Sequence, residues 1–134
     1  MRQGWPGFGR ETHRYMRGQC YDLAFALHEL LPGAELVGIG GTPRMSDHVA
    51  LRLDGGLYLD ARGLADEAGF RDGLGSCEDA IFPMTRDDVL GQMGLAHLAK
   101  PRSPELTKAR SVARALGRWQ AGIAVPDAEA APAP

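Results

Sequence analysis

The sequence contains little cysteine: only Cys20 and Cys77 among its 134 residues. One pair of cysteines cannot replace a hydrophobic core, so we exclude a disulfide framework and expect two free thiols. The sequence also has no Cys-x-x-Cys motif and no cluster of histidine and cysteine with the spacing of a zinc site. We therefore expect a domain that folds by burying apolar side chains and that needs no metal and no cofactor.

Long apolar runs are absent as well. No run approaches the roughly 18 residues that a membrane span needs, and residues 1–6 lack the apolar centre of a signal peptide. We therefore expect a cytoplasmic protein with no membrane partner. With 44% hydrophobic and 24% charged residues, the composition is that of a globular protein. The length predicts one domain over residues 1–121, followed by a disordered Ala- and Pro-rich tail over residues 122–134.

The chain has no large excess of charge of either sign, since its formal net charge is -2. Acidic residues dominate the middle of the chain, however, whereas basic residues dominate both ends. A predicted helix over residues 103–120 carries Arg110, Arg114 and Arg118 at intervals of four. This basic stripe either folds back onto the acidic body, remains solvated, or binds an acidic partner. No aromatic residues alternate with the charges, so we expect no nucleic-acid partner.

Hydrophobic periodicity predicts an α+β fold. Apolar residues follow the helical rule over residues 20–31, and Pro32 and Gly33 end the run. Residues 36–39 and 80–82 are expected to form short strands, whereas 1–16, 42–47 and 63–79 are expected to be irregular. A short helix is expected over residues 85–93. The resulting expectation is an antiparallel sheet of three to five strands, with the first helix packed on it and the C-terminal helix across an outer side.

The clearest pattern is a hairpin over residues 49–61. A three-residue loop at Asp54-Gly55-Gly56 places Leu51 opposite Leu59, and it brings all the apolar residues of both strands to one face. In that register His48 lies diagonally across from Asp60 on the other, polar face, within reach of a hydrogen bond. Packing alone therefore predicts that the imidazole and the carboxylate meet.

Cys20 opens the predicted helix, and with His48 and Asp60 it forms the set of groups used in acyl transfer through a thiol. A helix N-terminus and an imidazolium both stabilise a thiolate, which is the reactive form. Cys20 is the expected nucleophile, His48 the base and later the acid, and Asp60 the residue that orients the imidazole. Each residue also has an ordinary structural role available: a small apolar side chain, a satisfied polar group, and an acid paired with Arg62.

Three segments resemble the papain-like cysteine superfamily, which includes transglutaminase-like domains, arylamine N-acetyltransferases, cell-wall peptidases and bacterial effector deamidases. They are Arg-Gly-Gln-Cys-Tyr-Asp-Leu-Ala at 17–24, Asp-His-Val-Ala-Leu at 47–51 and Leu-Tyr-Leu-Asp-Ala-Arg-Gly at 57–63. The resemblance implies a nucleophile at the start of a helix, and a histidine and an acid on neighbouring antiparallel strands.

That resemblance implies a cysteine hydrolase or acyl transferase, such as an amidase, deamidase, peptidase or transglutaminase-like enzyme. Cys20, His48 and Asp60 would form the triad, and Gln19 would position the oxyanion or the substrate. In papain-type enzymes the glutamine lies several residues before the cysteine, whereas here it is adjacent. The short chain favours a compact site for a terminal amide, a glutamine side chain or a small thioester, most simply within a protein or peptide.

A second hypothesis belongs to another functional class. The same fold can act as a non-catalytic binding or inhibitor module that contacts an acidic partner through the basic helix over residues 103–120. An enzyme should lose all activity in Cys20→Ala while keeping its fold. A binding module should tolerate that change and lose its partner when Arg110, Arg114 and Arg118 are neutralised.

Overall fold

The computed structural model describes residues 2–75, 78–94 and 104–124. Its centre is a six-stranded sheet of order β1-β5-β4-β3-β2-β6, in which all neighbouring strands are antiparallel. The strands are β1 (Arg2–Gly4), β2 (Glu35–Thr42), β3 (Met45–Arg52), β4 (Tyr58–Asp60), β5 (Gly63–Ala65) and β6 (Ile81–Pro83). The helices are η1 (His13–Met16, 3₁₀), α1 (Cys20–Leu30), α2 (Glu67–Arg71), α3 (Arg86–Gln92) and α4 (Pro104–Ala124).

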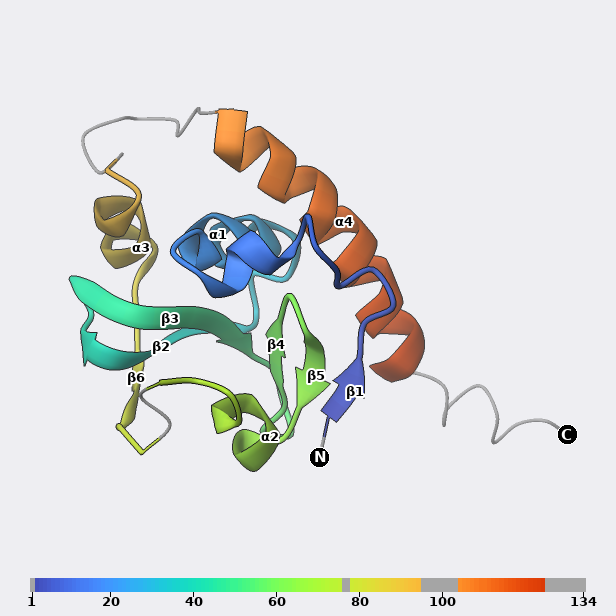
Figure 1. The fold of residues 1–134 in the computed structure, drawn as a ribbon, viewed down its shortest axis with the longest axis horizontal. Coiled ribbons are helices and arrows are strands. Elements are labelled where there is room, and N and C mark those ends of the chain that lie inside the picture. Colours follow the sequence, from blue (N-terminus) through green and yellow to red (C-terminus); the bar gives the residue numbers. More distant parts are fainter. Residues whose placement is uncertain (1, 76–77, 95–103, 125–134) are drawn as a thin grey trace, which may run out of the picture.

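The helices form layers on both faces of the sheet (Figure 1). α1 lies against one face and α4 packs on the outer side of α1, as the sequence predicts, while α2 covers the opposite face. The larger core fills the space between α1, α4 and the sheet, and includes Leu27, Leu51 and Leu116. A smaller core under α2 contains Ile39, Tyr58 and Phe70. The α+β prediction is therefore confirmed.

The hairpin of β3 and β4 has the predicted register. Leu51 lies opposite Leu59, and the Leu53 amide donates to the Leu57 carbonyl at 2.7 Å, which closes the three-residue loop. The face expected to be polar is nevertheless buried, because Tyr58 on that face stacks on Phe70 of α2 at 4.6 Å between ring centroids. His48 and Asp60 consequently lie in an interior environment.

Two segments expected to be irregular contain regular structure. β1 forms near the N-terminus, and the segment after β4 contains β5 and α2, so the sheet has more strands than the three to five expected. Strands of three residues are too short to show alternation, and α2 has only five residues, so no periodicity reveals them. Asp66, whose side chain accepts from the Gly69 amide, is the local signal for the start of α2.

The expected loop over residues 42–47 is also wrong. β2 and β3 continue to a tight turn in which Thr42 pairs with Met45. Gly41 has a φ of +72°, and a Cβ there would lie 2.1 Å from the Met45 carbonyl oxygen. Gly40 and Gly41, which follow the strand expected over residues 36–39, are therefore part of β2, and Gly41 allows close approach of the two backbones.

The C-terminal helix begins at Pro104, at the predicted position, and extends to Ala124. Its apolar stripe is buried as expected and consists of Leu106, Ala109, Ala113 and Leu116. Residues 122–124, which composition assigned to the tail, are helical, whereas residues 125–134 lie outside the described residues. No helix within the described part of the chain is long and apolar enough to cross a membrane.

Candidate functional site

Cys20 is the first residue of α1, as predicted. Gly18 has a φ of +98°, a left-handed conformation that turns the chain into the helix, and Gln19 is the N-cap. The thiol of Cys20 is free and only 2% of the residue is exposed, within the larger core beside Tyr15. The first amides of a helix have no partner inside the helix, so this position favours a negatively charged group.

His48 and Asp60 meet on neighbouring strands. His48 lies in β3 and Asp60 ends β4, and the His48 Nε2 atom is 3.1 Å from the Asp60 Oδ2 atom. His48 is 2% exposed and Asp60 is 6% exposed, so the hydrogen bond is shielded from water. The diagonal pairing inferred from the hairpin register is confirmed.

The second nitrogen of the imidazole faces a different situation. Among the described residues, His48 Nδ1 is buried and has no partner at ordinary hydrogen-bond geometry. Cys20 lies near enough to the ring to raise the pKa of His48 through hydrogen bonding and through its charge. Since Nε2 is held by Asp60, Nδ1 is the nitrogen left to exchange a proton with the thiol.

Burial and pairing act on the pKa of His48 in opposite directions. Burial lowers the pKa, but the hydrogen bonds and charges of Asp60 and Cys20 outweigh it and raise the pKa to about 9. Burial likewise raises the pKa of Asp60, but His48 and Arg62 hold it well below its usual range. At neutral pH the pair is therefore an imidazolium and a carboxylate.

Arg62 is a site residue whose importance the sequence did not reveal. Its Nη2 atom donates to Asp60 Oδ2 at 2.8 Å, and its backbone amide donates to Asp60 Oδ1 at 2.9 Å. The sequence suggested an Asp60–Arg62 pair as an alternative to the His48–Asp60 pair, whereas the structure contains both. Arg62 lies in the turn between β4 and β5, across which Asp60 pairs with Gly63.

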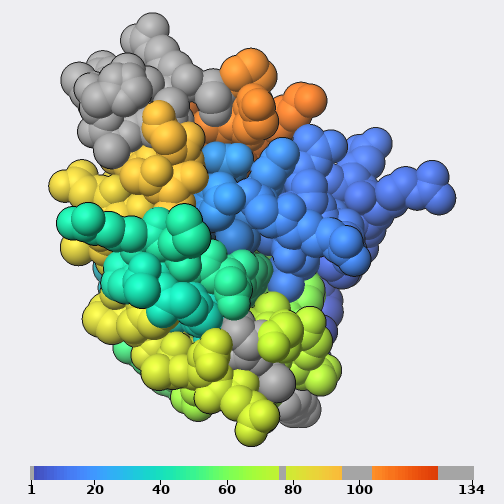
Figure 2. All heavy atoms as spheres, turned by 60° about the vertical axis from the view of Figure 1, so that its left-hand side comes forward, coloured from blue at the N-terminus to red at the C-terminus, as the bar shows by residue number. Residues whose placement is uncertain are grey.

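A pocket of about 210 Å³ opens beside His48. Three segments form it: η1 and the residue after it, the start of β3, and the loop after α2, which adjoin on the face drawn in Figure 2. Its lining residues are His13, Met16, Arg17, Asp47, His48, Gly73, Leu74 and Gly75. Cys20 does not line this pocket, so a substrate bound there reaches the thiol only when neighbouring side chains move aside.

Gln19 lies directly before the nucleophile. Among the described residues, its side-chain Oε1 atom is buried without a hydrogen-bond partner. An oxyanion needs a donor, so only the Nε2 atom of this side chain would be suitable, together with the amides at the start of α1. The predicted role of Gln19 stays a prediction.

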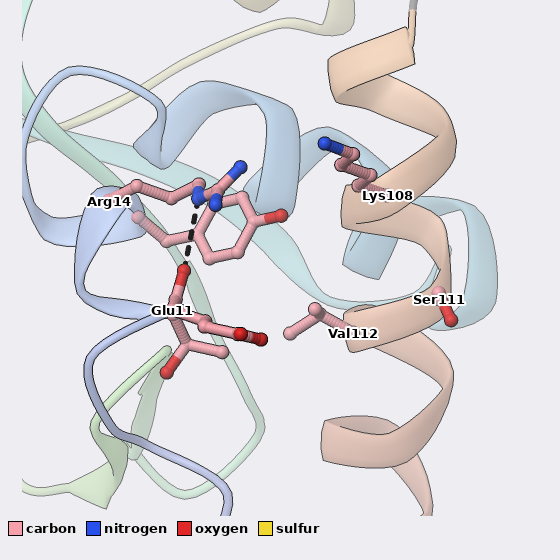
Figure 3. Close-up of a pocket in the computed structure, with 7 residues that line it drawn as sticks. Glu11, Arg14, Lys108, Ser111 and Val112 are labelled. Atoms are coloured by element: carbon pink, nitrogen blue, oxygen red, sulfur yellow. Dashed lines mark hydrogen bonds between the residues drawn. The ribbon is translucent and has the colours of Figure 1, made fainter.

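A separate pocket of about 380 Å³ lies between residues 11–15 and α4 (Figure 3). Arg14, whose Nε atom donates to the Glu11 carbonyl at 3.0 Å, and Lys108 approach it from opposite sides. Its lining includes the hydroxyl groups of Thr12, Tyr15 and Ser111, but neither a thiol nor a histidine. Within the described residues, no group of three or more histidine, cysteine, aspartate or glutamate side chains could hold a metal ion, and Cys77 lies outside those residues.

The basic stripe of α4 is partly engaged within the molecule. Arg110 donates to both carboxylate oxygens of Glu29, at 2.9 and 2.8 Å, while Arg114 and Arg118 are exposed. Arg110 therefore joins α4 to α1, as in the first of the three alternatives that the sequence left open, in which the basic end folds back onto the acidic body.

No protein-family model, curated protein or solved structure matches the chain. The arrangement of Cys20, His48 and Asp60 is therefore the observation from which a function can be inferred.

Proposed function

We propose that the protein is a thiol-dependent hydrolase or acyl transferase that acts through Cys20, His48 and Asp60. The observation that carries this proposal is the buried hydrogen bond of 3.1 Å between His48 and Asp60, beside a free thiol at a helix start. A buried charge is costly unless it is paired and hydrogen-bonded. Even a buried ion pair is a weak means of stabilising a core. An imidazolium held next to a thiol has a direct use in acyl transfer.

In the first step, the Cys20 thiolate attacks the acyl carbon and forms a tetrahedral intermediate. The amides at the start of α1, with Gln19 Nε2, donate to the oxyanion. The His48 imidazolium then gives its proton to the leaving amine, the carbon–nitrogen bond breaks, and a thioester to Cys20 remains. Asp60 keeps the ring oriented throughout.

In the second step, the now neutral His48 takes a proton from an incoming water or amine, which attacks the thioester. The carbon–sulfur bond breaks, the thiolate of Cys20 returns, and His48 is again an imidazolium. Water gives a carboxylic acid and therefore hydrolysis or deamidation, whereas an amine gives a new amide and therefore transamidation. The residues serve both outcomes equally.

The size of the pocket favours a small acyl group. A volume of about 210 Å³ accommodates one side chain or a chain terminus rather than an extended peptide. A glutamine side chain or a terminal amide of a protein or peptide therefore suits the site.

We further propose a papain-like fold, supported by a nucleophile helix packed on antiparallel strands that carry the histidine and the acid. We also propose the cytoplasm as the compartment, since a working thiol must stay reduced.

The alternative proposal is a binding or inhibitor module that uses the basic helix. Arg110 is already paired with Glu29, so Arg114 and Arg118 are the members of the stripe that would meet an acidic partner. Exposed arginines are common on helices, and a buried His48–Asp60 pair beside a thiol is not needed for such a role. The triad is therefore the better-supported function.

The test is the pH profile of alkylation of Cys20 by iodoacetamide in a Cys77→Ser variant, read by mass spectrometry. Cys20 is equally buried in a folded variant that lacks the imidazole, so the difference between the two profiles reports the effect of His48 on the thiol. We expect the rise in rate to occur at a lower pH than the value of about 8.5 for a free thiol. His48→Gln should move the rise to alkaline pH, while its circular dichroism matches the parent.

A profile that rises only near pH 8.5 and does not change in His48→Gln would refute the proposed triad. A glutamine-containing peptide incubated with the protein then provides the substrate test, with released ammonia as the readout and Cys20→Ala as the matched control. Ammonia release that survives in Cys20→Ala would also count against the proposal.

A further inference from the structure

We propose that Arg62 is a positioning residue whose guanidinium shares Asp60 with His48 and couples this pair to the pocket wall at residues 73–75. The inference rests on the proposed function for its use in catalysis, but its physical content concerns His48, Asp60 and Arg62 alone. It follows from the full set of contacts made by one guanidinium group.

The first set of contacts fixes Asp60. The Arg62 side chain approaches the carboxylate through Nη2 at 2.8 Å and through Nε at 3.2 and 3.3 Å. The side chain of Arg62 is only 10% exposed, so solvent screens this ion pair weakly. Asp60 is therefore shared between two cations, His48 on one side and Arg62 on the other.

The second set of contacts fixes the end of α2. Arg62 Nη2 donates to the Phe70 carbonyl at 2.8 Å, and Nη1 donates to the Asp72 carbonyl at 2.6 Å. These carbonyls belong to the last turn of the helix and to its C-cap, where a cation is favourable. Gly73 follows directly, and Gly73, Leu74 and Gly75 line the pocket beside His48.

The two sets of contacts act on the same imidazole. Phe70, whose carbonyl Arg62 holds, lies with its ring centroid 5.8 Å from that of His48. One guanidinium thus joins the acid of the triad, the helix that packs on the base, and the wall of the pocket. A structural ion pair would need only the contact with Asp60.

The charge of Arg62 also limits how strongly Asp60 can hold the proton on His48. The charged groups that act on His48 are Asp60 and Cys20, those that act on Asp60 are His48 and Arg62, and His13, Arg17 and Asp47 border the pocket. Removing the charge of Arg62 leaves its backbone amide on Asp60 Oδ1. Asp60 then stays anchored and acts on His48 without competition.

The test follows the Hε1 resonance of His48 by NMR as a function of pH, in Arg62→Gln and in the charge-conserving control Arg62→Lys. Cys20→Ala serves as the background, which removes the thiol from the titration. We expect Arg62→Gln to shift the midpoint upward by about 0.5 to 1 pH unit, with Arg62→Lys close to the parent. Amide hydrogen exchange at residues 70–74 should accelerate at least about tenfold in both variants. Both variants lose the pair of hydrogen bonds from the guanidinium to the Phe70 and Asp72 carbonyls.

An unchanged midpoint in Arg62→Gln, or unchanged exchange at residues 70–74, would overturn the inference. If Arg62→Gln does not fold, Arg62→Lys carries the test through hydrogen exchange, and exchange equal to the parent's refutes the coupling to the wall. Failure of the proposed function is seen separately, as a Cys20 alkylation profile of an ordinary thiol in the Cys77→Ser protein. That result leaves the His48 titration in the Cys20→Ala background fully interpretable.

Discussion

At the scale of single residues, the site depends on a balance between desolvation and pairing. His48 and Asp60 are both buried, and each would be destabilised in its charged form without the other. Sequence patterning predicted that they meet, because register determines which residues share a face of a hairpin. It could not predict that Asp60 pairs with His48 and Arg62 at the same time. The contacts of Arg62 depend on α2, a helix too short to leave a periodic signal.

The balance predicts how stability depends on pH. The folded pKa of His48, about 9, lies above the unfolded value of about 6.5. Its contribution to the free energy of unfolding is therefore fully present below about pH 6.5 and is lost as the pH rises through 9. We expect urea unfolding of the Cys20→Ala, Cys77→Ser protein, in which no thiol titrates, to show a decline over this window, on the order of 3 kcal/mol at most.

Asp60→Asn in the same Cys20→Ala, Cys77→Ser background is the matched control for this decline. Asparagine keeps the shape of Asp60 but not its charge, so burial then dominates and lowers the pKa of His48 below its ordinary value. The contribution of His48 then reverses in sign: it is present above about pH 6.5 and is lost as the pH falls. The same decline toward pH 9 in Asp60→Asn as in the parent would contradict the assigned pairing.

At the scale of elements, the long segments were predictable, and so were the short β6 and α3, whereas β1, β5 and α2 were not. α1 and α4 have a clear helical period, and the β3–β4 hairpin alternates over both strands. β1 and β5 have three residues each, and their pairing depends on Gly63, whose φ is +125°. No local pattern identifies a strand that forms only because a distant segment lies beside it.

Gly63 allows a quantitative prediction for the β1–β5 pair. A Cβ at this position would lie 2.1 Å from the Gln3 carbonyl oxygen, a backbone atom that cannot turn away. We expect Gly63→Ala to cost at least about 2 to 3 kcal/mol in urea unfolding, from overpacking together with left-handed strain. Gly55→Ala is the control: its φ is +86° and no atom lies within 4 Å of the added Cβ, so strain alone should cost about 1 kcal/mol. Equal costs for the two variants would show that β1 and β5 do not pack as described.

At the scale of the whole molecule, one carboxylate links three helices. Glu29 of α1 pairs with Arg110 of α4 at 2.8 Å, and it lies 3.9 Å from Arg86 of α3. The acidic middle of the chain thus meets its basic end, as composition allowed but did not require. The sequence could indicate the two charged regions, but not which of three equally spaced arginines faces inward. That choice depends on the rotation of α4 about its axis, which its buried apolar stripe determines.

Arg110 is paired within the molecule, whereas Arg114 and Arg118 are exposed, so one set of variants can distinguish the two proposed functions. Arg110→Gln should lower the free energy of unfolding by about 0.5 to 1 kcal/mol, because it breaks a half-exposed ion pair. The double variant Arg114→Gln, Arg118→Gln should stay within about 0.5 kcal/mol of the parent, because both side chains are exposed. An acyl-transfer enzyme keeps the Cys20 alkylation profile and its ammonia release in the double variant, since neither arginine lines the pocket beside His48. A binding module instead loses retention on an acidic peptide column in the double variant while Cys20→Ala retains it, and that pair of results would favour the basic helix as the functional surface.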